Sequence, residues 1–202
     1  MSVPITLTKS LAHPDPAHIP LSQKIIALCG DSKSTHSLIL QSLCIRAARG
    51  EHLALVIGDN HFDAYRLARL ARAHGFDPAA LLSCIELSRP LTCYQLQHRV
   101  LSLYAQNQDA YDALYVIGLL ETFYDEDVKE SEAIRLLIQI LTHLKIVAAD
   151  GLPILLSMAL PKLGGRAHLM ELVKHAVHAY WQPSPIVFDQ VNAQQLAFTE
   201  MF

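Results

Sequence analysis

Short apolar segments alternate with amphipathic ones along most of this chain, after a polar start that contains several prolines. The apolar runs have strand character and cover residues 24–29, 53–57, 85–87, 113–118 and 153–158. Apolar positions at helical spacing predict helices over residues 37–49, 62–74, 91–107, 130–149 and 167–177. A further strand-like segment follows at residues 183–189. This order predicts an α/β fold with three layers, in which helices cover both faces of a mostly parallel sheet.

The pattern divides the chain into three parts. Residues 1–22 include four prolines and predict an extended N-terminal arm, in which alternating apolar residues could add as a strand to another surface. Residues 23–196 form the predicted domain. Residues 197–202 form a tail whose apolar side chains suit docking onto a partner. The alternatives are a disordered tail and an arm that is disordered or packs on its own domain.

Composition narrows the possible functions. A net charge of −3 gives no electrostatic reason to expect nucleic acid as a ligand. No apolar run reaches the roughly 18 residues of a membrane span, and the start of the chain does not resemble a signal peptide. The four cysteines lack metal-ligand spacing, so we expect reduced core thiols and no metal site. These features favour a cytoplasmic protein, or a nuclear one in a eukaryote, without a membrane partner.

The segment after the first predicted strand carries the main candidate chemistry. It matches the spacing of the phosphate-binding pattern G-x-x-x-x-G-K-[ST] between a strand and a helix. Gly30 fills the first glycine and Ser37 the last hydroxyl, but Thr35 and His36 replace the second glycine and the lysine. Lysine supplies a permanent charge to phosphate, whereas His36 is shorter and mostly neutral near pH 7. The alternative is a plain polar loop in which Ser34 or Thr35 caps the following helix.

Four segments, taken in order, resemble the ATPase core of the RecA/RadA recombinase superfamily, and the resemblance covers residues 24–160. Its nearest members are the archaeal and eukaryotic recombinases and their paralogues. The matching segments are the loop at residues 30–41, the strand and turn at 56–67, the helix, turn and strand within 73–92, and the strand at 111–117. The resemblance implies a RecA-like P-loop core.

The departures from the family pattern fall on its catalytic positions. Gly118 stands where the family has the Walker B aspartate, Asp59 where it has the catalytic glutamate, and Ala159 where it has a polar sensor. Glu121, three residues after Gly118, is a further carboxylate that could approach a metal. Phosphoryl transfer depends on lysine, magnesium and an oriented water. The resemblance therefore implies a degenerate nucleotide pocket, no ATPase activity, no cofactor and at most weak ATP binding.

The two loops that hold DNA in the family are also altered here. Residues 121–132 contain six acidic residues and one lysine, which would repel phosphate. A solvated helix N-terminus explains the same acidic run. Residues 161–168 are short and keep Lys162 and Arg166, which are the possible DNA contacts. A plain basic turn is the alternative for them.

The resemblance thus implies a non-hydrolysing RecA-like recombinase paralogue, acting as an accessory or mediator subunit in homologous recombination or DNA repair through protein contacts. The implied partners are further copies of this chain or a RecA-like protein, with weak or indirect nucleic acid binding. Two alternatives stay open. One is a regulatory protein that binds nucleotide weakly through Gly30, Ser34 and Ser37. The other is a RecA-like scaffold outside recombination, such as a cell-division inhibitor or a ring of the Elongator type that handles RNA.

Overall fold

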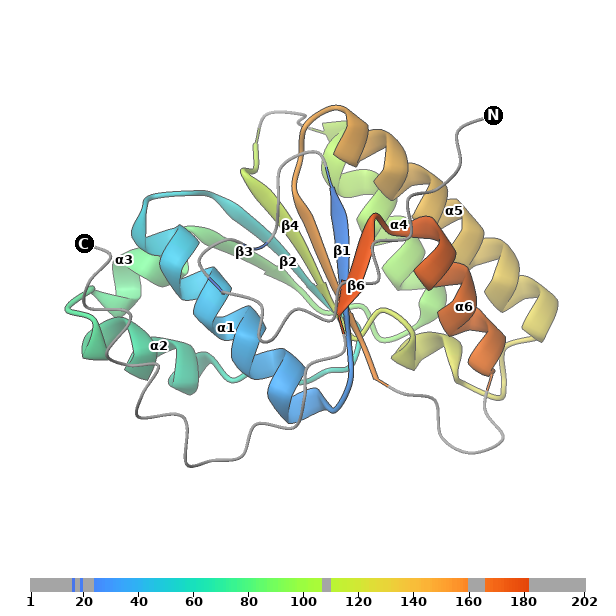
Figure 1. Cartoon of the computed structure of the whole chain (residues 1–202), viewed down its shortest axis with the longest axis horizontal. Coiled ribbons are helices and arrows are strands. Elements are labelled where there is room, and N and C mark those ends of the chain that lie inside the picture. The colour runs from blue at the N-terminus through green and yellow to red at the C-terminus, as the bar shows by residue number, and fades with distance from the viewer. Residues whose placement is uncertain (1–15, 17–18, 20–23, 107–109, 160–165, 182–202) are drawn as a thin grey trace.

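The computed structural model describes residues 16, 19, 24–106, 110–159 and 166–181, without the side chains of residues 32 and 104–106. Figure 1 shows the chain. The predicted strand at residues 183–189, the tail at 197–202 and almost all of the arm at 1–22 lie outside these described residues.

Six strands form one sheet in the order β3-β2-β4-β5-β1-β6, and every pair of neighbours is parallel. The strands are β1 (Ile25–Cys29), β2 (Leu53–Ile57), β3 (Ile85–Ser88), β4 (Ala113–Ile117), β5 (Ile154–Met158) and β6 (Ala179–Trp181). The four central strands are buried along their whole length, as expected when both faces of a parallel sheet are covered.

The helices divide between the two faces of the sheet. They are α1 (Ser32–Ala48), α2 (Ala64–Ala73), α3 (Pro78–Ser83), α4 (Cys93–Gln106), α5 (Glu130–Ala149) and α6 (Ala167–Ala176), with a 3-10 turn, η2, at Glu121–Phe123. Figure 1 shows α1, α2 and α3 on one face and α4, α5 and α6 on the other. The predicted three-layer α/β architecture is confirmed, and it is consistent with a RecA-like core.

Each face of the sheet has its own apolar core. The core under α4, α5 and α6 includes Phe123, and the core under α1, α2 and α3 includes Tyr115. Ile19, which belongs to the predicted arm, is 1% exposed and packs in the second of these cores. Its carbonyl oxygen accepts a hydrogen bond from the Ser42 hydroxyl. This end of the arm therefore packs on its own domain.

The buried strands and the long helix α5 lie where the apolar pattern predicts them. Cys29, Cys44 and Cys93 are buried free thiols, as predicted, and the free thiol Cys84 is half-buried. Helix α3 and strand β6 were not predicted, because six and three residues are too few to show a clear period. Within the part of the chain that the structure describes, no helix combines the length and apolarity needed to cross a lipid bilayer.

Candidate functional site

The carboxyl ends of β1, β2, β4 and β5 meet at one edge of the sheet, where ligands bind in open parallel sheets. Gly30, Asp59, Gly118 and Ala159 follow these four strands directly or within two residues. Backbone hydrogen bonds tie the strand ends together, including 3.3 Å from Gly30 N to the Met158 carbonyl oxygen. The fold therefore brings the predicted pocket residues to one place.

Helix α1 begins at Ser32, so the expectation of a polar loop before a helix that begins at residue 37 is wrong. The N-cap is Asp31, not Ser34 or Thr35. Its carboxylate accepts hydrogen bonds from the backbone N–H groups of Lys33 at 2.9 Å and Ser34 at 3.1 Å. An aspartate in this position satisfies the free amides of a first helical turn, which extends the helix over a polar segment. Residues 34–37 are thus helical, not part of a loop.

The cap changes what this helix end can bind. Hydrogen bonding by Ser34, helped by the Lys33 amide and charge, lowers the pKa of the Asp31 carboxyl below its usual value. Asp31 is therefore an anion near neutral pH, and it already uses amides that a phosphate would need. A phosphate that approached the capped amides themselves would meet the negative charge of Asp31.

The hydroxyl residues of the predicted pocket are engaged within the protein. Ser34, Thr35 and Ser37 are all buried. The Thr35 hydroxyl donates to the Asp31 carbonyl oxygen at 3.0 Å. The Ser37 hydroxyl accepts from the Arg66 guanidinium at 2.9 Å, which ties α1 to α2. These contacts, together with the side-chain hydrogen bond between Ser34 and Asp31, give the three residues a structural role in the first turns of α1.

The side chains of His36 and Asp59 contact each other between α1 and the end of β2. His36 Nε2 lies 2.9 Å from Asp59 Oδ2, and their side chains are 17% and 10% exposed. Burial alone would raise the pKa of the Asp59 carboxyl, but hydrogen bonds from His36 and from the His61 backbone outweigh it and lower that pKa. The two residues expected at the lysine and catalytic glutamate positions of the family pattern thus contact each other.

Gly118 has no room for a side chain. Its φ is +64°, and a Cβ atom there would lie 2.5 Å from the Asp59 Cβ and 2.7 Å from the Asp59 nitrogen. A Cβ on the neighbouring Gly58 would overlap the Gly118 carbonyl oxygen. The turns after β2 and β4 are therefore in backbone contact. A carboxylate at position 118 would require these two turns to separate.

Glu121 is a further carboxylate of this edge. Its Oε1 accepts from the Ala159 backbone N–H at 3.2 Å, while its Oε2 is buried without a hydrogen-bond partner among the described residues. Burial raises the pKa of the Glu121 carboxyl, the nearby Asp59 adds to the rise, and His36 opposes it. No group of three or more acidic, histidine or cysteine side chains among the described residues could hold a metal ion.

Of the two possible DNA contacts, the structure describes only Arg166. Its guanidinium donates to the carbonyl oxygen of Phe123 at 2.7 Å and also to that of Val128. Arg166 thereby holds the acidic segment after β4 in place. Lys162 lies outside the described residues.

A cavity of about 700 Å³ opens at the same edge of the sheet, between α1 and the segment that leads from β2 into α2. Its lining includes Lys33, Phe62, Tyr65, Arg66 and Arg89, which lie in the matched segments but are not among the predicted site residues. A sequence signal for Phe62, Tyr65 and Arg66 lies in residues 62–72, where two aromatic residues and three arginines occur within 11 positions.

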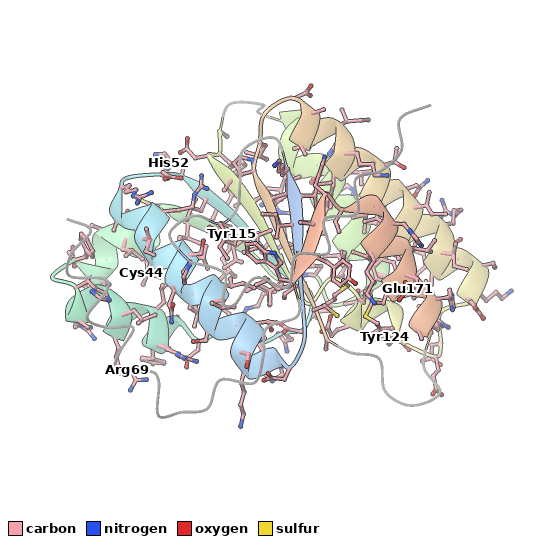
Figure 2. The ribbon with its side chains drawn as sticks, in the orientation of Figure 1. Cys44, His52, Arg69, Tyr115, Tyr124 and Glu171 are labelled. Atoms are coloured by element: carbon pink, nitrogen blue, oxygen red, sulfur yellow. The ribbon has the colours of Figure 1, made fainter. Side chains whose placement is uncertain are left out.

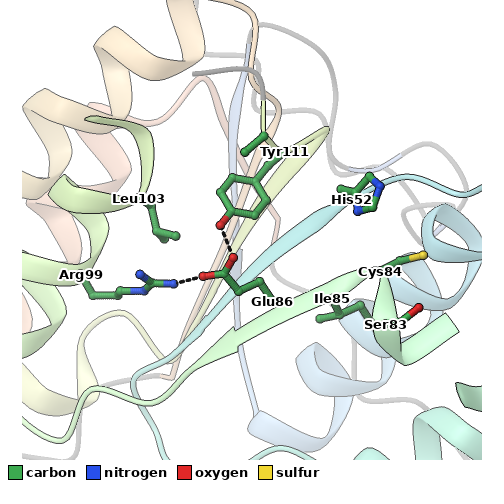
Figure 3. A pocket seen from close by; sticks show the side chains of 9 residues that line it. His52, Ser83, Cys84, Ile85, Glu86, Arg99, Leu103 and Tyr111 are labelled. Atoms are coloured by element: carbon green, nitrogen blue, oxygen red, sulfur yellow. Dashed lines mark hydrogen bonds and ion pairs between the residues drawn. The ribbon is translucent and has the colours of Figure 1, made fainter. Parts of the chain in front are cut away.

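A second cavity, of about 650 Å³, lies at the opposite edge, where β2, β3 and β4 begin. Figure 3 shows Glu86 between Arg99 and Tyr111, and its carboxylate accepts a hydrogen bond from each. The hydrogen bond from Tyr111 and then that from Arg99 lower the pKa of the Glu86 carboxyl. Burial and the nearby Glu86 carboxylate raise the pKa of Tyr111 to about 12. No residue of the predicted nucleotide pocket lies here.

Comparison with known proteins supplies no family. No protein-family model matches this chain, and neither does any curated protein.

Proposed function

We propose that this chain is a non-hydrolysing RecA-like paralogue, an accessory or mediator subunit in homologous recombination or DNA repair that acts through protein contacts. The backbone contact between the turns after β2 and β4 is the observation that carries the proposal. It leaves no space for a Walker B carboxylate at Gly118. A RecA-like domain without that group and without the loop lysine has lost the means to position magnesium and phosphate.

The cap on helix α1 supports the same proposal independently. Asp31 occupies the amides that would bind phosphate, and His36 is paired with Asp59 instead of facing a ligand. The Asp31 cap and the contact between His36 and Asp59 are both made within the protein, and they stabilise the site without a ligand. A fold with the layers of an ATPase core, whose phosphate-binding amides and Walker B position are engaged in internal contacts, is suited to binding other proteins.

The surface provides places for such contacts. Among the described residues, strand β3 lies at the edge of the sheet with an exposed Leu87, and an open edge can pair with a strand from another chain. Leu91, Tyr94 and Ile138 are exposed apolar residues in or just before α4 and in α5. We propose a further copy of this chain or a RecA-like protein as the partner, in the cytoplasm or, in a eukaryote, in the nucleus.

The test compares the full chain with a chain that lacks residues 1–10, which spares the buried Ile19. For the full chain, size-exclusion chromatography with light scattering should show an oligomer or a complex with the RecA-type recombinase of the same organism. The truncated chain should form less of this oligomer or complex. A monomer that does not bind that recombinase would contradict the proposal. If the complex forms equally well without residues 1–10, the arm is not the connector.

Enzymatic measurements complete the test. We expect no magnesium-dependent release of phosphate from ATP above background, and calorimetric ATP binding weaker than about 1 mM at pH 7. Phosphate release that disappears in Asp59→Ala would overturn the non-hydrolysing part of the proposal. ATP binding that appears only below pH 6 would identify protonated His36 as the substitute for the lysine.

A further inference from the structure

The cavity beside α1 and α2 collects positive charge, although the chain as a whole is acidic. Three permanent cations line it, and they are Lys33, Arg66 and Arg89. Asp63 is its lining carboxylate, and that carboxylate caps α2 by accepting from the Arg66 backbone N–H at 2.8 Å. The local balance therefore favours an anionic ligand.

The positive charge continues from the cavity along α2. Arg69 and Arg72 are exposed on this helix, which contains no acidic residue. Figure 2 shows Arg69 pointing away from the sheet into solvent. The acidic segment at residues 121–132 belongs to the other face, with α4 and α5, so this concentration of negative charge lies across the sheet from the arginines of α2.

Aromatic surface lies among these cations. Tyr65, the second residue of α2, is 87% exposed, although it lines the cavity. Phe62 also lines it and packs against the core under α1, α2 and α3, as does the buried Leu40. An exposed tyrosine within a positively charged surface is poorly explained by core packing. It is the arrangement with which proteins stack bases beside bound phosphates.

We propose that this basic aromatic surface, formed by Lys33, Phe62, Tyr65, Arg66 and Arg89 and continued by Arg69 and Arg72, binds single-stranded nucleic acid. A base stacks on Tyr65 at the cavity, and the flanking phosphates bind Lys33 and Arg89. The cavity, about 700 Å³, falls within the usual range for ligand sites. The arginines along α2 extend beyond it, which suits a chain of phosphates better than one free nucleotide.

This surface is separate from Lys162 and Arg166, the contacts expected from the sequence, and it does not depend on the proposed function. Arg166 is bonded to the carbonyl oxygens of Phe123 and Val128. The cations on α2 and Arg89 are exposed or half-exposed. The hydrogen bond that Arg66 donates to the Ser37 hydroxyl fixes the position of Arg66 in the cavity wall.

The experiment measures fluorescence anisotropy of a labelled oligothymidine with the full chain across a salt series that starts at about 50 mM. Tyr65→Ala should weaken binding by about 5- to 160-fold through the lost base stacking. Lys33→Gln/Arg89→Gln should lower the magnitude of the salt slope by about 1.4, since each phosphate contact on a single strand contributes about 0.7. The matched control, Tyr94→Ala/Lys145→Gln, removes one exposed aromatic and one exposed cation from the other face and should bind like the parent.

Competition identifies the ligand class. Unlabelled oligothymidine should displace the probe, whereas ATP and an oligoglutamate at equal charge should not. Displacement by ATP would show a free-nucleotide site, and displacement by oligoglutamate a docking surface for acidic protein segments. Either result overturns the proposal. It is also overturned if the parent chain fails to bind at the lowest salt, or if the three substitutions Tyr65→Ala, Lys33→Gln and Arg89→Gln together leave binding unchanged.

Discussion

Gly118 offers the sharpest test of the contact between the turns after β2 and β4. We expect Gly118→Ala to lower the free energy of unfolding by about 2–5 kcal/mol. A left-handed φ of +64° costs a residue with a Cβ atom about 1–2 kcal/mol. A Cβ placed 2.5 Å from the Asp59 Cβ forces the surrounding backbone to move, and such overpacking costs about 1–3 kcal/mol. The two costs arise from different causes and should add.

Other glycines of the chain separate these two costs. Gly75 has a φ of +78° with nothing within 4 Å of a Cβ position, so Gly75→Ala should show the conformational cost alone. Gly58 has no left-handed φ, but its Cβ would overlap the Gly118 carbonyl oxygen, so Gly58→Ala should show the steric cost alone. Gly118→Ala should lose more stability than either of them.

Urea denaturation followed by circular dichroism measures the change in unfolding free energy for each of the three variants. The comparison requires that the slope of the unfolding free energy against urea concentration is the same in all of them. If Gly118→Ala loses no more stability than Gly75→Ala, the two turns do not meet as described. Position 118 would then have room for a carboxylate. We also expect Gly118→Asp to show no magnesium-dependent ATP hydrolysis.

Two further predictions concern residues around the same edge. Because burial raises the folded-state pKa of Glu121, the folded protein binds more protons than the unfolded chain above pH 4.5, and stability falls as pH rises through that window. Glu121→Gln should therefore raise the unfolding free energy more at pH 7 than at pH 4. The control is Glu126→Gln, at an exposed neighbouring position. An equal gain at both pH values would contradict a raised pKa of Glu121 in the folded protein. Arg166→Ala should cost about 1–3 kcal/mol and speed hydrogen exchange in residues 121–130, since two carbonyl oxygens lose a charged donor. Lys174→Ala on the same helix should leave that exchange unchanged.

The sequence alone determined the layers of this protein. Strands that are buried on both faces must be continuously apolar, so β1, β2, β4 and β5 are visible as runs without any knowledge of their neighbours. Helix α5 spans residues 130–149, as predicted, because its acidic first turn and its apolar period both mark the same segment. The alternation of these elements then implies parallel pairing.

The sequence determined the start of α1 only in part, and the rest depended on the tertiary structure. Its first turn is polar, so no apolar period marks it, and the spacing of a phosphate-binding loop dominated the interpretation. The local signal was the side chain of Asp31 before a run of helix-compatible residues. Whether this carboxylate caps the helix or faces away is decided by the backbone entering from β1.

Only the tertiary structure decided the state of the candidate site. Sequence spacing gathers Gly30, His36, Asp59 and Gly118 at one edge, but it cannot show that His36 and Asp59 bind each other or that Gly118 touches Asp59. The basic aromatic surface also depends on Arg89 meeting α1 and α2, which are distant in the chain. Net charge is a sum over residues, whereas binding depends on which charges the fold places side by side.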